Sequence, residues 1–235
     1  MRVVALQLKN KPDYQKNLDE LIEAIKNESK DALIVAPEVC LTDYDYDNLQ
    51  SAADFGKKAL HRLLEVVDKE IVVLTLILQE GEHFVNKAVV INRGKIVHSQ
   101  NKYKLFKLGN EHHYLRAGDG KDIKIFEIDN IKYGLLICFE LRYKELWQKL
   151  EGADIILAPS QWGEPRKRHL EIIPNALAVI NQCYVVVANS SKEGMASSSA
   201  IYAPMGGVTI DDASSKIVSE IDLKQVKFMR RYIKL

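Results

Sequence analysis

The chain has 235 residues, of which 47% are hydrophobic and 28% charged, so it suits one large domain with a sizeable core. The formal net charge of +1 lacks the basic excess of nucleic-acid-binding proteins, and no nucleic-acid partner is expected. Cys40, Cys138 and Cys183 are widely spaced and form no CxxC pair. They therefore predict neither a disulfide framework nor a cysteine-based zinc site.

The start of the chain and its apolar runs predict neither a signal peptide nor a membrane span. MRVVALQLKNKPDY turns polar after a few apolar residues, unlike a secretory leader. The apolar run from Ile71 to Leu78 has the length of a strand, well short of the roughly 20 residues of a spanning helix. We therefore expect a cytoplasmic protein with no membrane partner, in a reducing compartment where cysteines stay free.

Short β-rich segments alternate with longer helical patterns along the chain. The first strand is expected at residues 2–8, and a helix follows from Asp13 because apolar residues recur there at 3.6-residue spacing. A second amphipathic helix is expected around residues 49–68. After Cys138 the pattern predicts a helix and, after a further strand, another that ends near Gln182. The further strands are predicted at residues 32–37, 71–78, 154–159 and 184–190.

Turn residues add hairpins to this alternation. Asn-Arg-Gly-Lys separates two β-rich runs in KAVVINRGKIVHSQ, and IKIFEIDNIKYGLLI is expected to turn at Asp129-Asn130. Gly206-Gly207 marks a turn among shorter strands in the last third of the chain. Strands that alternate with helices and also form hairpins predict an α/β layered fold with mixed sheets. No linker or charge block divides residues 1–235, so one domain is expected.

Two segments repeat one plan. DALIVAPE at residues 31–38 and ADIILAPS at residues 153–160 each have an acidic residue, an apolar run and Ala-Pro before a polar residue. A chance match of two such short windows stays open. If the match is structural, two similar halves present their strand ends at one rim, where α/β proteins commonly place their sites.

Cys138 lies at the exit of a predicted buried strand and is followed at once by a charged, helix-like segment. An inert core thiol is one interpretation, because free cysteine is among the most buried residue types. The other is a reactive thiol, because a strand-to-helix turn directs amide N–H groups at the side chain, lowers its pKa and offers an oxyanion site. Cys40 and Cys183 lack this setting and are interpreted as packing residues.

Glu38, Lys102 and Lys104 are the charged residues with a candidate chemical role. Glu38 follows the apolar LIVAP run, so it is either an exposed loop acid or a carboxylate in partly dry surroundings that can carry protons. Lys102 and Lys104 alternate across a predicted strand, NKYKLF, and one of them must face inward. Because a buried lysine without a role is costly, the inward one is expected to meet an acid.

These motifs, in this order, resemble the nitrilase superfamily of carbon–nitrogen hydrolases. APEVCLTDYDY is similar to the family's glutamate motif at Glu38, NKYKLF to its lysine motif at Lys102, and GLLICFELRYKEL to its cysteine motif at Cys138. Glu111 in EHHYLRAGD resembles a second active-site glutamate, and a further match is SAIYAPMG, from Ser199 to Gly206. The resemblance implies a four-layer α-β-β-α sandwich, a homodimer or larger homo-oligomer, and no metal or organic cofactor.

The chain departs from the family pattern at several positions. Lys104 replaces a histidine, Glu140 an aspartate and Lys144 a proline, and Leu177 and Ile180 stand where many members carry arginine and glutamate. The last two departures put in doubt any subunit contact or substrate group that those positions serve elsewhere. The compact length also leaves open whether the chain has the C-terminal arm that often crosses between subunits.

The resemblance implies hydrolysis of a non-peptide C–N bond of a small amide by a Glu38–Lys102–Cys138 triad. Cys138 would form a thioester, Lys102 and the Phe139 backbone N–H would hold the oxyanion, and Glu111 would orient Lys102 and the substrate. ω-Amides of dicarboxylic acids or N-carbamoyl amines are favoured over nitriles. A catalytically silent binding protein or an acyl transferase of the same fold stays open.

Aromatic and basic residues near the predicted site have two interpretations each. Tyr44, Tyr46 and Trp162 are candidate pocket walls, although aromatic residues more often belong to the core. Arg166 to His169 could bind a substrate carboxylate or form a solvated helix face, and the basic tail KFMRRYIKL could be a surface helix or a subunit contact.

Overall fold

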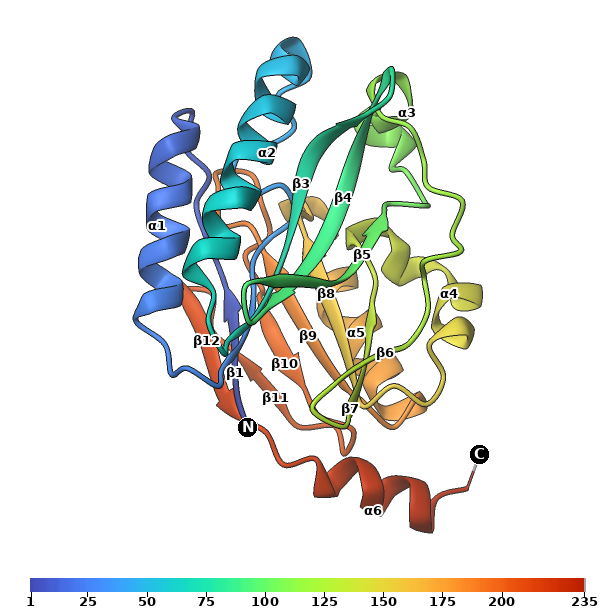
Figure 1. Ribbon diagram of the computed structural model, residues 1–235. Helices are drawn as coiled ribbons and strands as arrows, with labels where there is room; N and C mark the ends of the chain where they lie inside the picture. The colour runs from blue at the N-terminus through green and yellow to red at the C-terminus, as the bar shows by residue number, and fades with distance from the viewer. Residues whose placement is uncertain (235) are drawn as a thin grey trace.

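Two six-stranded β-sheets lie face to face in the computed structural model, which describes residues 1–234 (Figure 1). The first sheet has the order β12-β1-β2-β3-β4-β5 and the second the order β11-β10-β9-β8-β7-β6. The strands of the first sheet are β1 (Arg2–Leu6), β2 (Leu33–Val35), β3 (Ile71–Glu80), β4 (His83–Asn92), β5 (Lys95–Asn101) and β12 (Lys216–Glu220). Those of the second are β6 (Phe126–Ile128), β7 (Ile131–Leu135), β8 (Ile155–Ser160), β9 (Tyr184–Asn189), β10 (Ala200–Tyr202) and β11 (Val208–Ile210).

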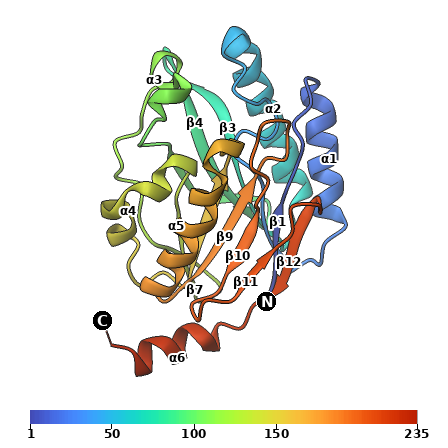
Figure 2. The ribbon, with the colours of Figure 1, turned by 180° about the vertical axis from the view of Figure 1, so that it is seen from behind.

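Helices cover the outer face of each sheet. Helices α1 (Tyr14–Lys26) and α2 (Leu49–Val66) lie on the first sheet, and α4 (Lys144–Lys149) and α5 (Lys167–Ile180) on the second (Figure 2). The short helix α3 (Glu111–Tyr114), the C-terminal helix α6 (Lys224–Tyr232) and four 3-10 turns complete the chain. The predicted four-layer α-β-β-α sandwich with two mixed sheets is confirmed. The turns are η1 (Tyr46–Asn48), η2 (Lys107–Gly109), η3 (Cys138–Arg142) and η4 (Glu164–Arg166).

Strand β1 shows how the sequence builds these layers. Because successive side chains of a strand point to opposite faces, its apolar residues divide between two cores. Val3 and Ala5 pack in the cluster between the sheets, whereas Val4 and Leu6 pack against the helices α1 and α2. A strand that is apolar on both faces is therefore buried on both faces, which is why these segments read as continuous hydrophobic runs.

Both predicted hairpins form, and each turns through two residues in the left-handed region. Arg93 and Gly94 have φ of 52° and 66° between β4 and β5, and Asp129 and Asn130 have φ of 50° and 61° between β6 and β7. Asparagine, aspartate and glycine tolerate this conformation best, and paired positive φ values are what two-residue hairpin turns require.

The repeated APE and APS segments occupy equivalent places in the two sheets. β2 lies at the centre of the parallel strands β1-β2-β3, and β8 at the centre of β7-β8-β9. Where these strands end, the backbone N–H of Glu38 donates to the carbonyl oxygen of Ser160 at 3.1 Å. The two halves therefore meet at one rim, as the internal repeat predicts.

The basic C-terminal tail is a surface helix that packs on its own chain. In α6 the buried Val226 and Met229 face the body of the domain. Arg230 donates to the Asp154 carboxylate at 2.9 Å and to the Ala153 carbonyl at 2.6 Å. The surface-helix interpretation of this tail is the one that the structure supports.

Candidate active site

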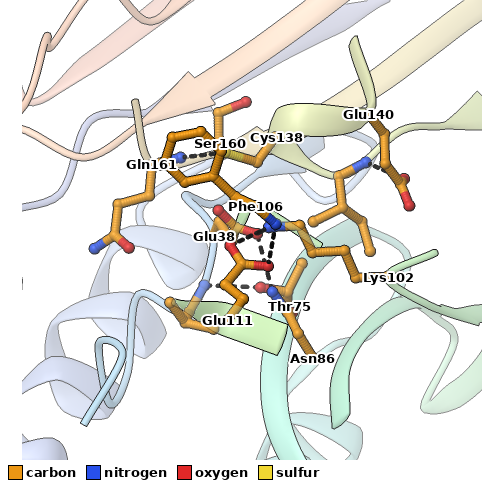
Figure 3. Close-up of polar contacts among 12 residues, drawn as sticks. Glu38, Thr75, Asn86, Lys102, Phe106, Glu111, Cys138, Glu140, Ser160 and Gln161 are labelled. Atoms are coloured by element: carbon orange, nitrogen blue, oxygen red, sulfur yellow. Dashed lines mark hydrogen bonds and ion pairs between the residues drawn. The ribbon is translucent and has the colours of Figure 1, made fainter. Parts of the chain in front are cut away.

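A buried lysine is the centre of the candidate site at the rim of the two sheets. Lys102 is 0% exposed, and its Nζ lies 2.7 Å from Glu38 Oε1 and 2.6 Å from Glu111 Oε1 (Figure 3). Burial alone lowers the pKa of Lys102, but the two carboxylates outweigh it and raise the pKa above the ordinary lysine value. Lys102 therefore stays charged in a dry site, as expected for an inward lysine that meets an acid.

Glu111 is the first residue of the short helix α3, and it forms a second ion pair with Lys102. Its Oε1 also accepts the Tyr44 hydroxyl at 3.0 Å, and its Oε2 accepts the Phe106 backbone N–H at 3.1 Å. Burial raises the pKa of Glu111, with the Lys102 charge opposing the shift and the Glu38 charge adding to it. Glu111, which resembles a second active-site glutamate of the family, thus contacts the lysine.

Asn86 and Tyr44 complete the network around Glu38. The Asn86 side chain, on β4, donates to Glu38 Oε1 at 2.9 Å and lies 3.0 Å from the Tyr44 hydroxyl. Lys102 also lies 3.1 Å from that hydroxyl. The other carboxylate oxygen, Glu38 Oε2, is buried and has no hydrogen-bond partner within residues 1–234. One oxygen of the Glu38 carboxylate is thus fixed by hydrogen bonds, and the other has lone pairs that no hydrogen bond uses.

Glu38 is positioned by strained backbone just beyond β2. Val39 has a φ of 43°, a conformation that is unfavourable for a β-branched residue. Its N–H donates to the Thr75 hydroxyl of β3 at 2.7 Å, which holds the chain in this turn. Non-glycine residues in the left-handed region cost about 1–3 kcal/mol and gather at functional sites.

Cys138 occupies the corresponding turn beyond β7. It is 7% exposed and has a φ of 51°, and the Gln161 N–H points to its Sγ at 3.5 Å. The prediction of a lowered thiol pKa is wrong for this state. Burial raises the pKa of Cys138 well above 9.0, and the negative charge of Glu38 adds to the shift more than Lys102 opposes it. The resting thiol therefore keeps its proton, and it needs a base before it can react.

The segment NKYKLF does not form the predicted strand. β5 ends at Asn101, because the N–H groups of Tyr103 and Lys104 donate to the Glu140 carboxylate instead of a neighbouring strand. Lys102 nevertheless points inward, while Lys104 is partly exposed and pairs with Glu145 at 3.2 Å. The selection of Lys102 over Lys104 as the buried lysine is confirmed.

A small cavity opens beside Cys138. Its volume is about 20 Å³, and Phe139 and the candidate pocket wall Trp162 line it. Tyr44 lies in the polar network and not in this lining, and Tyr46 stacks on Tyr114. The cavity is lined by Phe106, Cys138, Phe139, Arg142, Gln161, Trp162 and Arg166.

In the basic segment from Arg166 to His169, one residue lies at the cavity and two lie on the helix surface. Arg166 lines the cavity with its guanidinium 5.1 Å from the centre of the Phe106 ring, and His169 lies 2.8 Å from an Arg142 nitrogen. Lys167 and Arg168 pair with acids on the helix surface. Ser199 bonds Gln7 and Asn189 and so joins the two sheets.

Several residues of the site are absent from the sequence-based prediction. Asn86 directly precedes the predicted hairpin run KAVVIN, and the structure extends that strand to include it. Thr75 is the lone polar residue in the apolar run IVVLTLIL. Gln161 has no such signal, since it contacts the Cys138 thiol through its backbone N–H. Cys40 and Cys183 are buried, and burial raises the pKa of each to about 12, in agreement with packing roles.

The chain matches the carbon–nitrogen hydrolase family model over residues 2–231. The chain belongs to this family. The carbon–nitrogen hydrolase is 31% identical over 225 residues to the 2-oxoglutaramate amidase of Bacillus subtilis (strain 168), covering 89% of this chain and 85% of that protein. It is 28% identical over 214 residues to the deaminated glutathione amidase of Escherichia coli O157:H7, covering 85% and 81%.

Solved structures share the fold of this carbon–nitrogen hydrolase. Saccharomyces cerevisiae Nit3, a member of branch 10 of the nitrilase superfamily, superposes with a TM-score of 0.86 at 21% identity, covering 100% of this chain and 94% of that one. The amidase from Nesterenkonia sp. AN1, with acrylamide added at its active-site cysteine, superposes with a TM-score of 0.85 at 21% identity, covering 98% and 97%. The nitrilase-superfamily sandwich is thus confirmed.

Within residues 1–234, no group of three or more His, Cys, Asp and Glu side chains is arranged to hold a metal ion. No helix in the same residues combines the length and apolar character that crossing a membrane requires.

The burial difference between the two lysines gives the first test. Lys102→Ala leaves two buried carboxylates unpaired, so we expect a loss of about 3–5 kcal/mol in stability. If Lys102 is the oxyanion donor that the family resemblance implies, turnover falls at least about 100-fold. Lys104→Ala breaks one surface ion pair and should change both quantities little. Urea unfolding and turnover of both variants check this, and equal loss in both would contradict the assignment.

Proposed function

We propose that this carbon–nitrogen hydrolase cleaves the C–N bond of a small amide through a thioester at Cys138, releasing ammonia or an amine and a carboxylic acid. The observation that carries the proposal is the buried neighbourhood of a neutral thiol, a carboxylate oxygen without a partner and a charged lysine. These are the nucleophile, base and oxyanion donor that amide hydrolysis needs. The amidase relatives support the same reaction class.

The first half-reaction forms the thioester. Glu38 takes the Cys138 proton on Oε2, and Sγ bonds to the amide carbonyl carbon. The oxygen becomes an oxyanion, which Lys102 Nζ and the Phe139 backbone N–H stabilise in a water-poor site. Glu38 then passes the proton to the nitrogen, the C–N bond breaks and ammonia or an amine leaves. Because Lys102 is charged before the substrate arrives, no reorganisation is needed when the oxyanion forms.

The second half-reaction releases the acid by the same groups. Glu38 accepts a proton from water, whose oxygen attacks the thioester carbonyl carbon. The oxyanion is again held by Lys102, and the C–S bond breaks as the proton returns to Sγ. Glu38 is ionised at the start and the end of the cycle, and no other proton carrier is required. Asn86 and Glu111 keep the carboxylate and the lysine in place through both steps.

The cavity supports an amide that carries a carboxylate, an ω-amide of a dicarboxylic acid. Arg142 and Arg166 line it beside Cys138, and within residues 1–234 neither guanidinium forms an ion pair with a carboxylate. Burial and the neighbouring Arg166 charge lower the pKa of Arg142, so two like charges face one space. A substrate carboxylate relieves that repulsion, whereas the cation of an N-carbamoyl amine with a free amino group adds to it.

Ammonia release identifies the reaction. Wild-type protein incubated with ω-amides, N-carbamoyl compounds and nitriles should release ammonia from the ω-amides, and Cys138→Ala should release none, because the thioester cannot form. Cys183→Ala is the matched control, since Cys183 is buried in the core. Ammonia from Cys138→Ala would overturn the thioester. Silence of the wild type across the panel would favour a non-catalytic protein, and amide exchange to hydroxamate without hydrolysis would favour acyl transfer.

The arginine pair predicts a charge-selective loss. Arg142→Gln or Arg166→Gln should lower kcat/KM for glutaramate by about 10- to 100-fold, the effect of one hydrogen bond to a charged group. Butyramide, which has the same chain length without the carboxylate, should lose less than threefold. Arg168→Gln is the control, because Arg168 pairs with Glu171 on the helix surface. Equal losses of kcat/KM on both substrates would show that the arginines do not bind the substrate carboxylate.

We also propose that the protein forms a homodimer through the outer face of α5 and β11. Apolar side chains are exposed there, among them Val179, Ile180, Val208 and Ile210. Ile180 stands where many family members carry glutamate, so the face is more apolar than the family pattern suggests. Exposed apolar side chains gathered on one face are typical of a protein interface.

Sedimentation velocity tests the dimer. Wild-type protein should sediment at about twice the chain mass of 26.7 kDa, and Val179→Asp should shift it to the monomer because a buried charge opposes the contact. Val97→Asp is the matched control, since Val97 is 42% exposed against 41% for Val179 and lies on β5 of the other sheet. A monomeric wild type, or an equal shift in both variants, would refute this surface.

A further inference from the structure

Glu140 is a buried carboxylate that the proposed reaction does not use. It follows Cys138 by two positions, is 0% exposed, and lies in the 3-10 turn η3. Its Oε2 accepts the Ile137 N–H at 2.7 Å, and its Oε1 accepts the Tyr103 N–H at 2.7 Å and the Lys104 N–H at 3.3 Å. Every one of these three donors belongs to the backbone.

The three bonds join two segments that come from different sheets. Ile137 precedes Cys138 in the turn beyond β7, and Tyr103 follows Lys102 beyond β5. The carboxylate therefore bridges the chain next to the thiol and the chain next to the lysine. No N–H in this bridge is satisfied by regular strand pairing, so Glu140 supplies the hydrogen bonds that these backbone groups would otherwise lack.

We propose that Glu140 is a positioning residue, which sets the separation of Lys102 Nζ and Cys138 Sγ by binding the backbone beside both of them. It touches neither Lys102 nor Cys138 by a side-chain hydrogen bond, and it acts through the chain. The inference goes beyond the proposed hydrolysis but rests on it for its kinetic readout.

The chemistry of the bridge requires a carboxylate. Three N–H donors converge on two oxygens, and an ionised carboxylate accepts them all while offering no donor. A glutamine would turn an NH₂ group towards at least one N–H, which leaves two donors face to face in a buried place. Burial raises the pKa of Glu140 to about 7, although the three N–H bonds and Lys102 favour the ionised form. The ionised form, which accepts all three N–H groups, therefore predominates above about pH 7.

Strain at Cys138 explains why the turn needs such a tie. A φ of 51° is unfavourable for a non-glycine residue and persists only where surrounding contacts hold it. The Ile137–Glu140 bond closes that turn on itself, and the bonds to Tyr103 and Lys104 anchor it to the lysine segment. Without them, the turn can relax towards ordinary backbone and carry Sγ away from Glu38 and Lys102.

Kinetics of Glu140→Gln and Glu140→Asp test the proposal. We expect Glu140→Gln to lower kcat by about 100-fold, the typical effect of misplacing reacting groups by about 1 Å, with KM within threefold. Glu140→Asp keeps the charge but shortens the side chain by one methylene, and it should recover part of the loss. Glu145→Gln is the matched control, because Glu145 contacts the same segment only through the exposed Lys104 side chain.

Alkylation of Cys138 by iodoacetamide gives a readout that does not need turnover. Glu140→Gln should slow the reaction at least tenfold, because Cys138 Sγ no longer lies where Glu38 can take its proton. If the wild type releases no ammonia but is alkylated faster than Glu140→Gln, the proposed hydrolysis is contradicted and the positioning role is supported.

Thermal unfolding separates positioning from support of the fold. A lowered Tm with unchanged kcat and alkylation rate in the folded fraction would overturn the proposal. If Glu140→Gln does not fold, Glu140→Asp decides: reduced kcat at normal KM supports positioning, and wild-type kcat overturns it.

Discussion

The active-site region depends on one buried cation held between two carboxylates. Lys102 is fully buried, and it stays charged only because Glu38 and Glu111 both lie within 2.7 Å of its Nζ. Removing the lysine leaves two carboxylates without a counter-charge away from water, which is among the costliest defects that a core can carry. The lysine thereby ties the ends of β2 and β5 to the start of α3, and Asn86 and Tyr44 add hydrogen bonds to the two carboxylates.

The same network determines which of its groups carry a proton. Glu38 and Lys102 form an ion pair, and beside it the Cys138 thiol is kept neutral by burial and by the Glu38 charge. A thiolate at rest would be more reactive, but it would place two negative charges next to each other in a dry cavity. In the proposed reaction the thiol gives its proton to Glu38 only as the substrate carbonyl is attacked, and the oxyanion then shares the lysine.

Two strained turns bring these groups together from the two halves of the molecule. Val39 and Cys138 both have positive φ at the ends of strands in opposite sheets, and the Glu38–Ser160 backbone bond joins the two rims. Thr75 holds the first turn and Glu140 the second. The sandwich therefore provides a rigid frame for both turns. Arg142 and Arg166 line the cavity beside Cys138, where we propose that a substrate carboxylate binds.

Local sequence was sufficient for the elements and for the identity of the central residues. Period-two and period-3.6 patterns, the Arg93-Gly94 and Asp129-Asn130 turns and the APE and APS strand ends act over a few residues, so the hairpins and the layered α/β fold could be predicted. The choice of Lys102 over Lys104 came from the resemblance to the family motif. Only the tertiary structure decided the partners. Glu38 and Lys102 are 64 positions apart, Asn86 and Glu38 are 48, and Tyr103 and Glu140 are 37. The end of β5 at Asn101 and the raised pKa of Cys138 were mispredicted for this reason, because burial and a distant carboxylate govern both.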